Sequence, residues 1–360
     1  MSQKILINLT YYYPNISGLS QYAKILAEEL VKRGHVVTVL CGKHQKDLLE
    51  LENVNGVIVI RLGAIRRGKG LIVPSVIYKS INLVKNNEIV NCHLPSAEGV
   101  WVAILAKIFK KKLMVTYHCH YHLLTEWWQR PAYMLADKIV VNSLDYIEGN
   151  NLLKSFRRKI VEIWPPIKIP LGFAASLPSE DLRTFDKGEI QTVRRKKVVG
   201  FVGRISKEKN LEILIEAMKK LPDYELWLAG PEKISGEEKY QKKIEEMIGE
   251  NKKIRKLGIV ENIADYYKKI NCLVLPSNNT LESFGMVLAE AINCGTPVVA
   301  SNLPGIRVPI IKSGAGELFD PKSVDDLVEK IKLATQKKYA EIKSPIFGFR
   351  KTVDEYEKIF

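Results

Sequence analysis

The chain has 360 residues, of which 46% are hydrophobic and 26% are charged, a composition that argues against disordered and collagen-like proteins. This length favours two domains. Lysine and arginine outnumber aspartate and glutamate by 55 to 40, and residues 1–170 hold 23 basic and 12 acidic side chains. We therefore expect the first half to meet an acidic partner, such as nucleic acid, an anionic bilayer or a phosphorylated substrate.

The first half of the chain alternates between short apolar runs and amphipathic stretches. The apolar runs, which are rich in β-branched residues, predict strands at 5–9, 36–40, 57–60, 89–90, 113–117, 139–141 and 160–163. The clearest helix is predicted over residues 20–33, where apolar side chains recur every three or four positions and Gly34 ends the element. This alternation predicts a parallel sheet with helices on both faces.

A charged stretch with weak periodicity, residues 176–197, is interpreted as a linker. Beyond it the pattern predicts strands at 198–203, 224–229, 254–260, 272–275 and 297–300, and helices at 210–221, 240–250, 263–270, 284–293 and 324–333. The predicted fold is α/β, with an N-terminal domain at 1–170, a C-terminal domain at 171–345 and a C-terminal helix within 346–360 that crosses back. Ligands of open α/β sheets bind outside the carboxyl ends of the strands, so we expect the site where the domains face each other.

The segment Pro276–Glu290 carries the strongest chemical signal. A strand ends, a polar loop follows, and a helix is predicted to begin near Ser283, with free N–H groups that suit a phosphate. Gly285 would let an anion approach the backbone. On one helix, Glu282 and Glu290 would lie roughly 12 Å apart, too far for an acid–base pair on one bond. They could hold hydroxyls at the two ends of one ligand, or be a helix-terminal charge and an unrelated surface glutamate.

Two further loops follow predicted strands and offer groups for phosphate. After the strand that ends at Gly203, Arg204 presents a planar fork of donors and Lys209 a point charge. In the N-terminal half, Gly18 stands at the start of the first helix. The alternative for the first loop is a common glycine–arginine turn before a charged helix. No Gly-x-Gly-x-x-Gly occurs, so the chain lacks the dinucleotide fingerprint.

His118, His120 and His122 alternate after another predicted strand. They would share one face of an extended chain and could bind a metal, but no acidic or cysteine ligand is spaced to complete the site. The preferred interpretation is a solvated or hydrogen-bonded histidine cluster that lines the cleft between the domains, with no metal. The five cysteines are scattered and never form a Cys-x-x-Cys pair, which favours a reducing compartment over disulfides or structural zinc.

The longest apolar stretch, Val100–Phe109, is interrupted by Lys107 and falls short of the roughly 20 residues of a membrane span. It is interpreted either as a membrane-surface helix or as a covering helix with a basic end. The basic loop 66–70 lacks neighbouring aromatic residues, so no nucleic-acid partner is expected. We expect a cytoplasmic protein, soluble or peripheral on the inner face of an anionic membrane.

Taken in order, these residues resemble the retaining glycosyltransferases of family four, whose GT-B fold has two facing Rossmann-like domains. The motifs that carry the resemblance are Phe201-Val202-Gly203-Arg204, the Glu282 and Glu290 pair, Gly295–Ala300, Gly314-Ala315-Gly316, Arg33–Val39 and Val115–His118. The chain departs from the family at Val308, where a glutamate is usual.

The resemblance implies a nucleoside-diphosphate-sugar donor in the C-terminal domain and a saccharide or lipid-linked acceptor in the N-terminal domain. Arg204 and Lys209 would neutralise the diphosphate, Glu282 would bind the donor sugar, and His118 would lie near the reacting carbon. The implied donor-binding set is Gly18, Gly203, Ser283, Phe284, Gly285, Met286, Val287 and Glu290, with Glu290 on the ribose. The implied reaction retains the anomeric configuration and uses neither a metal nor another cofactor.

Two other functions fit parts of the pattern. One is a nucleotide-sugar epimerase or a sugar-phosphate synthase on the same fold. The other is a polyanion-binding protein without enzymatic activity, which would have no use for the combination of cations, helix terminus and glutamates. The leading prediction is transfer of a hexosyl group.

Overall fold

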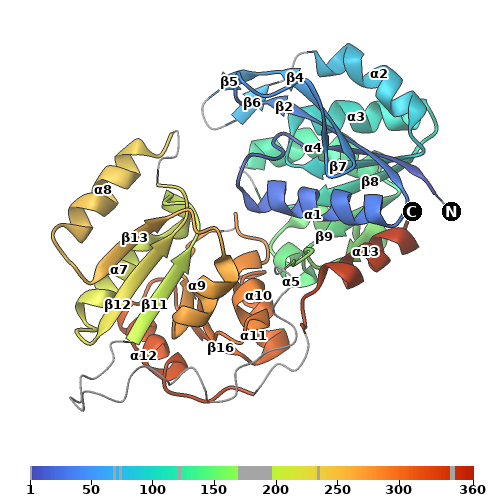
Figure 1. Ribbon diagram of the computed structural model, residues 1–360. Coiled ribbons are helices and arrows are strands. Elements are labelled where there is room, and N and C mark those ends of the chain that lie inside the picture. Colours follow the sequence, from blue (N-terminus) through green and yellow to red (C-terminus); the bar gives the residue numbers. More distant parts are fainter. Residues whose placement is uncertain are drawn as a thin grey trace.

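The computed structural model describes residues 2–67, 70–72, 75–120, 123–168, 197–232, 236–279, 281–340 and 345–360. In these residues the chain forms two α/β domains, each with its own sheet, as Figure 1 shows. The expected two-domain α/β organisation is therefore confirmed. The proposed boundary at residue 170 and nearly all of the linker at 176–197 lie outside the described residues.

The N-terminal domain contains an eight-stranded sheet in the order β10-β9-β8-β7-β1-β2-β4-β3. Its strands are β1 (Lys4–Asn8), β2 (Val36–Lys43), β3 (Leu51–Val54), β4 (Val57–Gly63), β7 (Ile89–Leu94), β8 (Lys112–Tyr117), β9 (Lys138–Val141) and β10 (Ile160–Glu162). In this sheet β3 runs antiparallel to β4, and the other neighbours pair in parallel. A separate hairpin joins β5 (Ile65–Arg67) to β6 (Gly70–Ile72).

Helices cover both faces of this sheet. Successive residues of β1 enter different cores, with Leu6 on one face and Ile5 and Ile7 on the other, as strand alternation requires. The first core is covered by α2 (Val76–Asn86), α3 (Ala97–Ile108), α4 (Leu123–Leu135), α5 (Leu144–Ile147) and α6 (Asn151–Lys154). The second core is covered by α1 (Gly18–Lys32) and α13 (Phe349–Lys358). The stretch at 100–109 therefore belongs to a covering helix, α3.

The C-terminal domain contains a six-stranded parallel sheet in the order β13-β12-β11-β14-β15-β16. Its strands are β11 (Lys197–Val202), β12 (Tyr224–Ala229), β13 (Ile254–Gly258), β14 (Cys272–Leu275), β15 (Val298–Ser301) and β16 (Gly316–Phe319). One face is covered by α7 (Leu211–Lys219), α8 (Glu238–Ile248) and α12 (Val324–Ala334). The other is covered by α9 (Ile263–Lys269), α10 (Met286–Asn293) and α11 (Val308–Ser313).

Small polar side chains fix where several helices begin. Ser17, Ser96, Ser143 and Ser323 each accept a hydrogen bond from the backbone N–H three residues ahead, which satisfies a donor that the helix cannot pair itself. Among the described residues, no helix is both long and apolar enough to cross a bilayer.

The two domains meet through aromatic and polar contacts near the crossings between them. Trp164, which follows β10, packs against Phe284 and Phe347. Beyond Phe347, helix α13 packs on α1 of the N-terminal domain, where the Tyr22 and Tyr356 hydroxyls lie 2.9 Å apart. Figure 1 accordingly shows the C-terminus beside the N-terminal domain.

Candidate active site

The order of the strands places the site in the C-terminal domain. The chain builds this sheet outward from β11 in one direction and from β14 in the other, so the strand order reverses between them. Ligands bind at such a reversal, outside the carboxyl ends of the strands. The loops that follow β11 and β14 touch there, because the Asn278 N–H donates to the Glu208 carbonyl at 3.3 Å.

Lys209 and Glu282 join these two loops as an ion pair. Lys209 ends the short 3-10 turn Lys207–Lys209, and its side chain is 14% exposed, whereas that of Glu282 is 23% exposed. The other carboxylate oxygen of Glu282 accepts a hydrogen bond from the Gly285 N–H at 3.2 Å. The structure thus brings together two residues that were predicted separately for the diphosphate and the sugar.

Arg204 lies on the same loop as Lys209, with its side chain 45% exposed. Its guanidinium is 3.2 Å from the Glu208 carboxylate, to which the Ser206 hydroxyl also donates at 2.6 Å. Burial acts to raise the pKa of Glu208, but the Ser206 hydrogen bond and the positive charges of Arg204 and Lys209 lower it overall. Both predicted phosphate-binding cations therefore have a glutamate partner in this structure.

Three neighbouring strands reach this edge at glycines. Gly203, Gly230 and Gly258 have φ angles of 153°, 141° and 65°. The Gly203 N–H donates to the Ala229 carbonyl at 2.9 Å, and the Gly230 N–H donates to the Gly258 carbonyl at 2.7 Å. A Cβ on Gly230 would lie 2.1 Å from the Gly203 carbonyl oxygen, so only glycine allows this approach.

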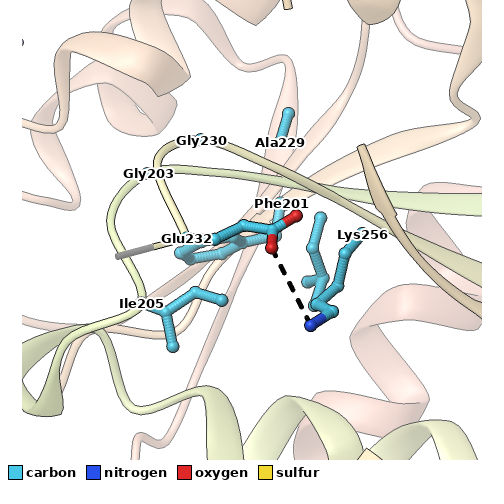
Figure 2. A pocket seen from close by; sticks show the side chains of 8 residues that line it. Phe201, Gly203, Ile205, Ala229, Gly230, Glu232 and Lys256 are labelled. Atoms are coloured by element: carbon cyan, nitrogen blue, oxygen red, sulfur yellow. Dashed lines mark ion pairs between the residues drawn. The ribbon is translucent and has the colours of Figure 1, made fainter. Parts of the chain in front are cut away.

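Figure 2 shows a pocket lined by two of these glycines, Gly203 and Gly230, and by Phe201, Ile205, Glu232 and Lys256. The Glu232 carboxylate lies 3.9 Å from the Lys256 ammonium across it. The free volume is about 10 Å³, which is room for about one water molecule. A nucleotide is far larger, so a donor at this edge would have to lie along the strand ends rather than inside the pocket.

We call the segment Glu282–Gly285 the donor loop. It precedes the helix, so the prediction that a helix begins near Ser283 is wrong. Helix α10 begins at Met286, because Gly285 has a left-handed φ of 78° that ends regular helical geometry. A Cβ on Gly285 would approach Leu288 Cδ1 to 2.9 Å, so the position requires glycine. Phe284 is buried against the aromatic contact between the domains.

Met286 and Val287 occupy the first turn of α10, where backbone N–H groups have no partner within the helix. The free N–H groups that the sequence analysis placed at Ser283 and Phe284 therefore belong to Met286 and Val287 instead. The helical spacing of roughly 12 Å between Glu282 and Glu290 does not apply, since Glu282 lies outside the helix.

Glu290 lies within α10 and accepts a hydrogen bond from the Tyr267 hydroxyl of α9 at 2.8 Å. Burial raises the pKa of Glu290 to about 7, although the Tyr267 hydrogen bond acts to lower it. The carboxyl group is therefore ionised above neutral pH and holds a proton below it. Near physiological pH, the Glu290 carboxyl group therefore changes between a form that can donate a hydrogen bond and a form that only accepts.

His118 lies at the carboxyl end of β8, buried beside His93, whose Nδ1 is 2.8 Å from His118 Nε2. Burial lowers the pKa of His118 to about 3, so the ring is neutral at physiological pH. His118 is hydrogen-bonded, as one form of the prediction had it, but it is buried rather than solvated, and its partner His93 is not a member of the predicted cluster. The described residues contain no group of three or more metal-ligating side chains, and His122 lies outside them.

The partners of His93 determine which nitrogen of His118 carries the proton. The Thr116 hydroxyl donates to Asn91 Oδ1 at 2.9 Å, so the Asn91 amide nitrogen faces His93 Nε2 at 3.2 Å and donates to it. The His93 proton therefore lies on Nδ1 and is donated to His118 Nε2. This leaves the His118 proton on Nδ1.

Gly18 is the first residue of α1, behind the Ser17 cap. A Cβ at this position would meet no atom within 4 Å among the described residues, so nothing there requires a glycine in this structure. The assignment of Gly18 to the donor-binding set stays a prediction.

Four residues outside the predicted set, two from each domain, connect the N-terminal domain to the donor loop and the turn beside it. The Asn142 amide donates to the Ser283 hydroxyl at 2.8 Å. Asp145 accepts hydrogen bonds from Arg307 Nε, at 3.1 and 3.0 Å to its two oxygens, and from Arg307 Nη2 at 2.5 Å, and it also accepts from the Gly305 N–H at 2.8 Å. A Cβ on Gly305 would lie 2.5 Å from the Ser283 carbonyl oxygen. The hydrogen bonds of Asn142 and Asp145 join positions more than 140 residues apart, so no local sequence signal could reveal them.

Two family models match this chain in sequence. Residues 16–166 match Glycosyltransferase Family 4, and residues 183–344 match Glycosyl transferases group 1. The chain belongs to the group 1 glycosyltransferases. It is thus an enzyme that transfers a hexosyl group from a nucleotide sugar.

Relatives of this glycosyltransferase support the assignment. An uncharacterized glycosyltransferase of Methanocaldococcus jannaschii is 28% identical over 349 residues, covering 89% of this chain and 86% of the relative. A D-inositol 3-phosphate glycosyltransferase of a Mycobacterium species is 32% identical over 212 residues, covering 56% of this chain and 47% of the relative.

Solved structures of glycosyltransferases confirm the GT-B fold. Anabaena HepE in complex with UDP-glucose is similar with a TM-score of 0.74 and 20% identity, covering 99% of this glycosyltransferase and 98% of HepE. At this identity the likeness shows the fold alone.

Proposed function

We propose that the enzyme transfers the hexosyl group with retention of the anomeric configuration and without a metal, to a hydroxyl of a saccharide or lipid-linked acceptor. The observation that supports this most is the Lys209–Glu282 pair, which joins the loops after β11 and β14 where the strand order reverses. A cation, a carboxylate and the first turn of α10 meet there, and together they match the charge of a diphosphate and the hydroxyls of a sugar.

Donor binding exchanges one partner of this ion pair for another. The diphosphate takes the Lys209 ammonium, and the backbone N–H groups at Met286 and Val287 add further donors. Glu282, released from Lys209, accepts hydrogen bonds from hydroxyls of the donor sugar. Arg204 adds a second cation at the mouth of the site, where its half-exposed guanidinium can leave Glu208 for a phosphate oxygen.

The chemical step needs no proton from a protein acid. The bond between the anomeric carbon and the diphosphate oxygen breaks, and the diphosphate leaves with the electron pair. The acceptor oxygen bonds to the same carbon on the same face, and its proton passes to the leaving diphosphate. Lys209 and the backbone donors stabilise the charge that develops on this leaving group.

Glu290 and His118 serve as hydrogen-bonding groups in this scheme. The Glu290 carboxylate accepts from the ribose hydroxyls of the donor. The neutral His118 ring presents its Nδ1 proton to a hydroxyl of the donor sugar near the reacting carbon. Because its pKa lies near 3, His118 does not act as a charged acid.

The donor and the stereochemistry are tested together. Thermal shifts with UDP-, GDP- and ADP-sugars identify the donor, because a ligand that binds the folded state raises its melting temperature. The reaction is then run with that donor and a chelator, and the anomeric configuration of the product is read by NMR. Retention with undiminished rate is expected. An inverted product, or activity that is lost with chelator and restored by Mg²⁺, would contradict the proposal.

A further inference from the structure

Helix α13 carries Tyr356 from the C-terminal end of the chain into the core of the N-terminal domain, where Figure 1 shows it near α1. The Tyr356 side chain is fully buried, and its hydroxyl lies 2.9 Å from the Tyr22 hydroxyl of α1 and 2.9 Å from the Thr116 hydroxyl of β8. Burial raises the pKa of Tyr22 well above its ordinary value and that of Tyr356 to about 12. Both tyrosine hydroxyls therefore keep their protons at physiological pH.

The directions of these hydrogen bonds follow from Thr116. Its hydroxyl has one proton, which it donates to Asn91 Oδ1 at 2.9 Å, so it can only accept from Tyr356. The Tyr356 proton is thus used, and the Tyr356 oxygen accepts from the Tyr22 hydroxyl. Tyr22 is buried, and within the described part of the chain its hydroxyl forms no other hydrogen bond. Tyr22 therefore depends on Tyr356 for an acceptor.

The ring of Tyr22 packs against the two neighbouring histidines. Its centre lies 4.9 Å from that of the His118 ring at an interplanar angle of 89°, and 5.7 Å from that of the His93 ring at 79°. Aromatic rings at such separations favour this edge-to-face arrangement. The hydrogen bond from His93 holds His118 at Nε2, and the Tyr22 ring limits rotation about that bond. The direction in which His118 Nδ1 points therefore depends on where the Tyr22 ring lies.

We propose that Tyr356 is a positioning residue that acts on His118 through Tyr22. By accepting the Tyr22 proton, Tyr356 holds the Tyr22 ring against His118 and so sets the direction of the His118 Nδ1 proton. The inference rests on the proposed function, in which this proton meets a hydroxyl of the donor sugar. The last helix of the chain thereby completes the N-terminal half of the active site, although Tyr356 lies 240 residues beyond Thr116 in the sequence.

Other contacts hold α13 on the N-terminal domain. Arg33, at the end of α1, forms an ion pair with Asp354 at 2.6 Å. One turn before Tyr356, the Thr352 hydroxyl donates to the Trp164 carbonyl at 2.9 Å. Loss of the Tyr356 hydroxyl alone should therefore leave the helix docked, so an effect at the histidines reports the loss of the hydrogen bond and not the loss of the helix.

The first test is Tyr356→Phe, which removes one oxygen atom and keeps the ring. It leaves the buried Tyr22 hydroxyl without an acceptor, a costly state that the Tyr22 side chain can relieve only by moving. We expect kcat to fall about tenfold with little change in donor KM, because a displaced His118 ring is misaligned with the reacting sugar while the nucleotide contacts are untouched. In the free enzyme, NMR of ¹⁵N-labelled histidine should show shifted His118 signals.

Tyr22→Phe and the double variant Tyr22→Phe/Tyr356→Phe separate this route from a general loss of packing. Tyr22→Phe keeps the ring against His118 and removes the hydroxyl that needs an acceptor, so kcat should fall by no more than about twofold. The double variant lacks both hydroxyls and should match Tyr22→Phe, which makes it faster than Tyr356→Phe alone. Two independent losses of packing would instead add, so the recovery is specific to this hydrogen bond.

Thr352→Val is the matched control, because it removes a buried hydroxyl from the same helix whose partner is the Trp164 carbonyl rather than Tyr22. It should leave kcat and the His118 signals unchanged, and thermal unfolding should show that every variant folds. Unmoved His118 signals in Tyr356→Phe, an equal loss of kcat in Thr352→Val, or a double variant no faster than Tyr356→Phe would each overturn the proposal. Shifted His118 signals with an unchanged kcat would support the positioning and contradict the proposed role of His118 in sugar transfer.

Discussion

Lys209 and Glu282 neutralise each other before any ligand is bound, and this shapes what each of them can do. A partly buried ammonium without a partner is costly, so the pair keeps both groups in place in the free enzyme. A diphosphate carries more negative charge than a single carboxylate and competes well for Lys209. The free carboxylate of Glu282 is then available only when the donor is present.

Replacing Lys209 by methionine keeps the volume of the side chain and removes its charge. We expect turnover to fall about 10²–10³-fold, because the leaving diphosphate loses its nearest cation. Lys207→Met is the matched control, since Lys207 lies in the same 3-10 turn but is exposed. Steady-state kinetics with the identified donor measures both variants. Equal losses in the two would show that the effect is not specific to the Glu282 pair.

The raised pKa of Glu290 predicts a dependence of stability on pH. Its pKa in the folded protein, about 7, is above the ordinary value of 4.5, so the folded state binds the proton more tightly between these values. This group therefore stabilises the fold fully at acid pH, and its contribution is lost as the pH rises through 7. Above pH 7 the folded protein carries a charge on this partly buried carboxyl group.

Glu290→Gln removes that charge and keeps an acceptor for the Tyr267 hydroxyl. We expect its melting temperature at pH 8 to exceed that of the unaltered enzyme by about 2–4 °C, with little difference at pH 5. Donor turnover should nevertheless fall, because the ribose hydroxyls lose a carboxylate. Thermal unfolding at both pH values checks the first expectation. A variant whose melting temperature is lower than that of the unaltered enzyme by the same amount at pH 8 and pH 5 would contradict this expectation.

The proton position on His118 depends on Asn91, which does not touch the site. Asn91→Leu replaces the amide by an apolar group of similar shape and removes the donor to His93 Nε2. Both rings could then exchange tautomers, and we expect the rate to fall roughly tenfold or more with little change in donor KM. NMR of ¹⁵N-labelled histidine should show one Nδ1–H tautomer before the change and a mixture after it. A single Nε2–H tautomer in the unaltered enzyme would refute the assignment.

At the level of elements, the site is a junction of loops rather than the end of one helix. Short, mainly apolar runs predicted β12 and β14 to the residue, and the rule for carboxyl ends correctly brought the loops after β11 and β14 together. The start of α10 was missed because it depends on the left-handed φ of Gly285, and a glycine in the sequence does not by itself indicate a positive φ. The short β3 and the β5–β6 hairpin were missed because they are polar or brief.

The loop before α11 connects the donor loop to the N-terminal domain through Asp145 and Arg307. These side chains form a bidentate pair that is 26% and 33% exposed, and the Gly305 N–H shares the same carboxylate. The pairing could not be predicted, because it depends on how the two domains meet. The same holds for Asn142 and Ser283.

Asp145→Ala and Arg307→Ala should each lower kcat/KM roughly tenfold, because the donor loop loses a support from the opposite domain. The double variant should lose little more than either single variant, since both remove the same contact. Asp325→Ala is the control, because Asp325 pairs with Lys220 at 2.5 Å on an exposed surface within the C-terminal domain. Fully additive losses would show that the two residues act independently.

At the level of the whole molecule, the two halves of the chain have different chemical tasks. In the proposed reaction, the C-terminal domain contributes the Lys209–Glu282 pair, the donor loop and Glu290, and the N-terminal domain contributes His118 and the contacts of Asn142 and Asp145. The excess of basic residues in the first half predicts an acidic partner on that side, and this stays a prediction. Composition could not tell which partner, since it does not show where the cations lie on the surface.

The central claim is that a donor diphosphate takes Lys209 from Glu282. A crystal structure with the nucleoside diphosphate sugar tests it most directly. It should show a phosphate oxygen within hydrogen-bond distance of the Lys209 ammonium, backbone N–H groups at the start of α10 on the diphosphate, and Glu282 turned to a sugar hydroxyl. A donor bound elsewhere, with Lys209 and Glu282 still paired, would contradict the account.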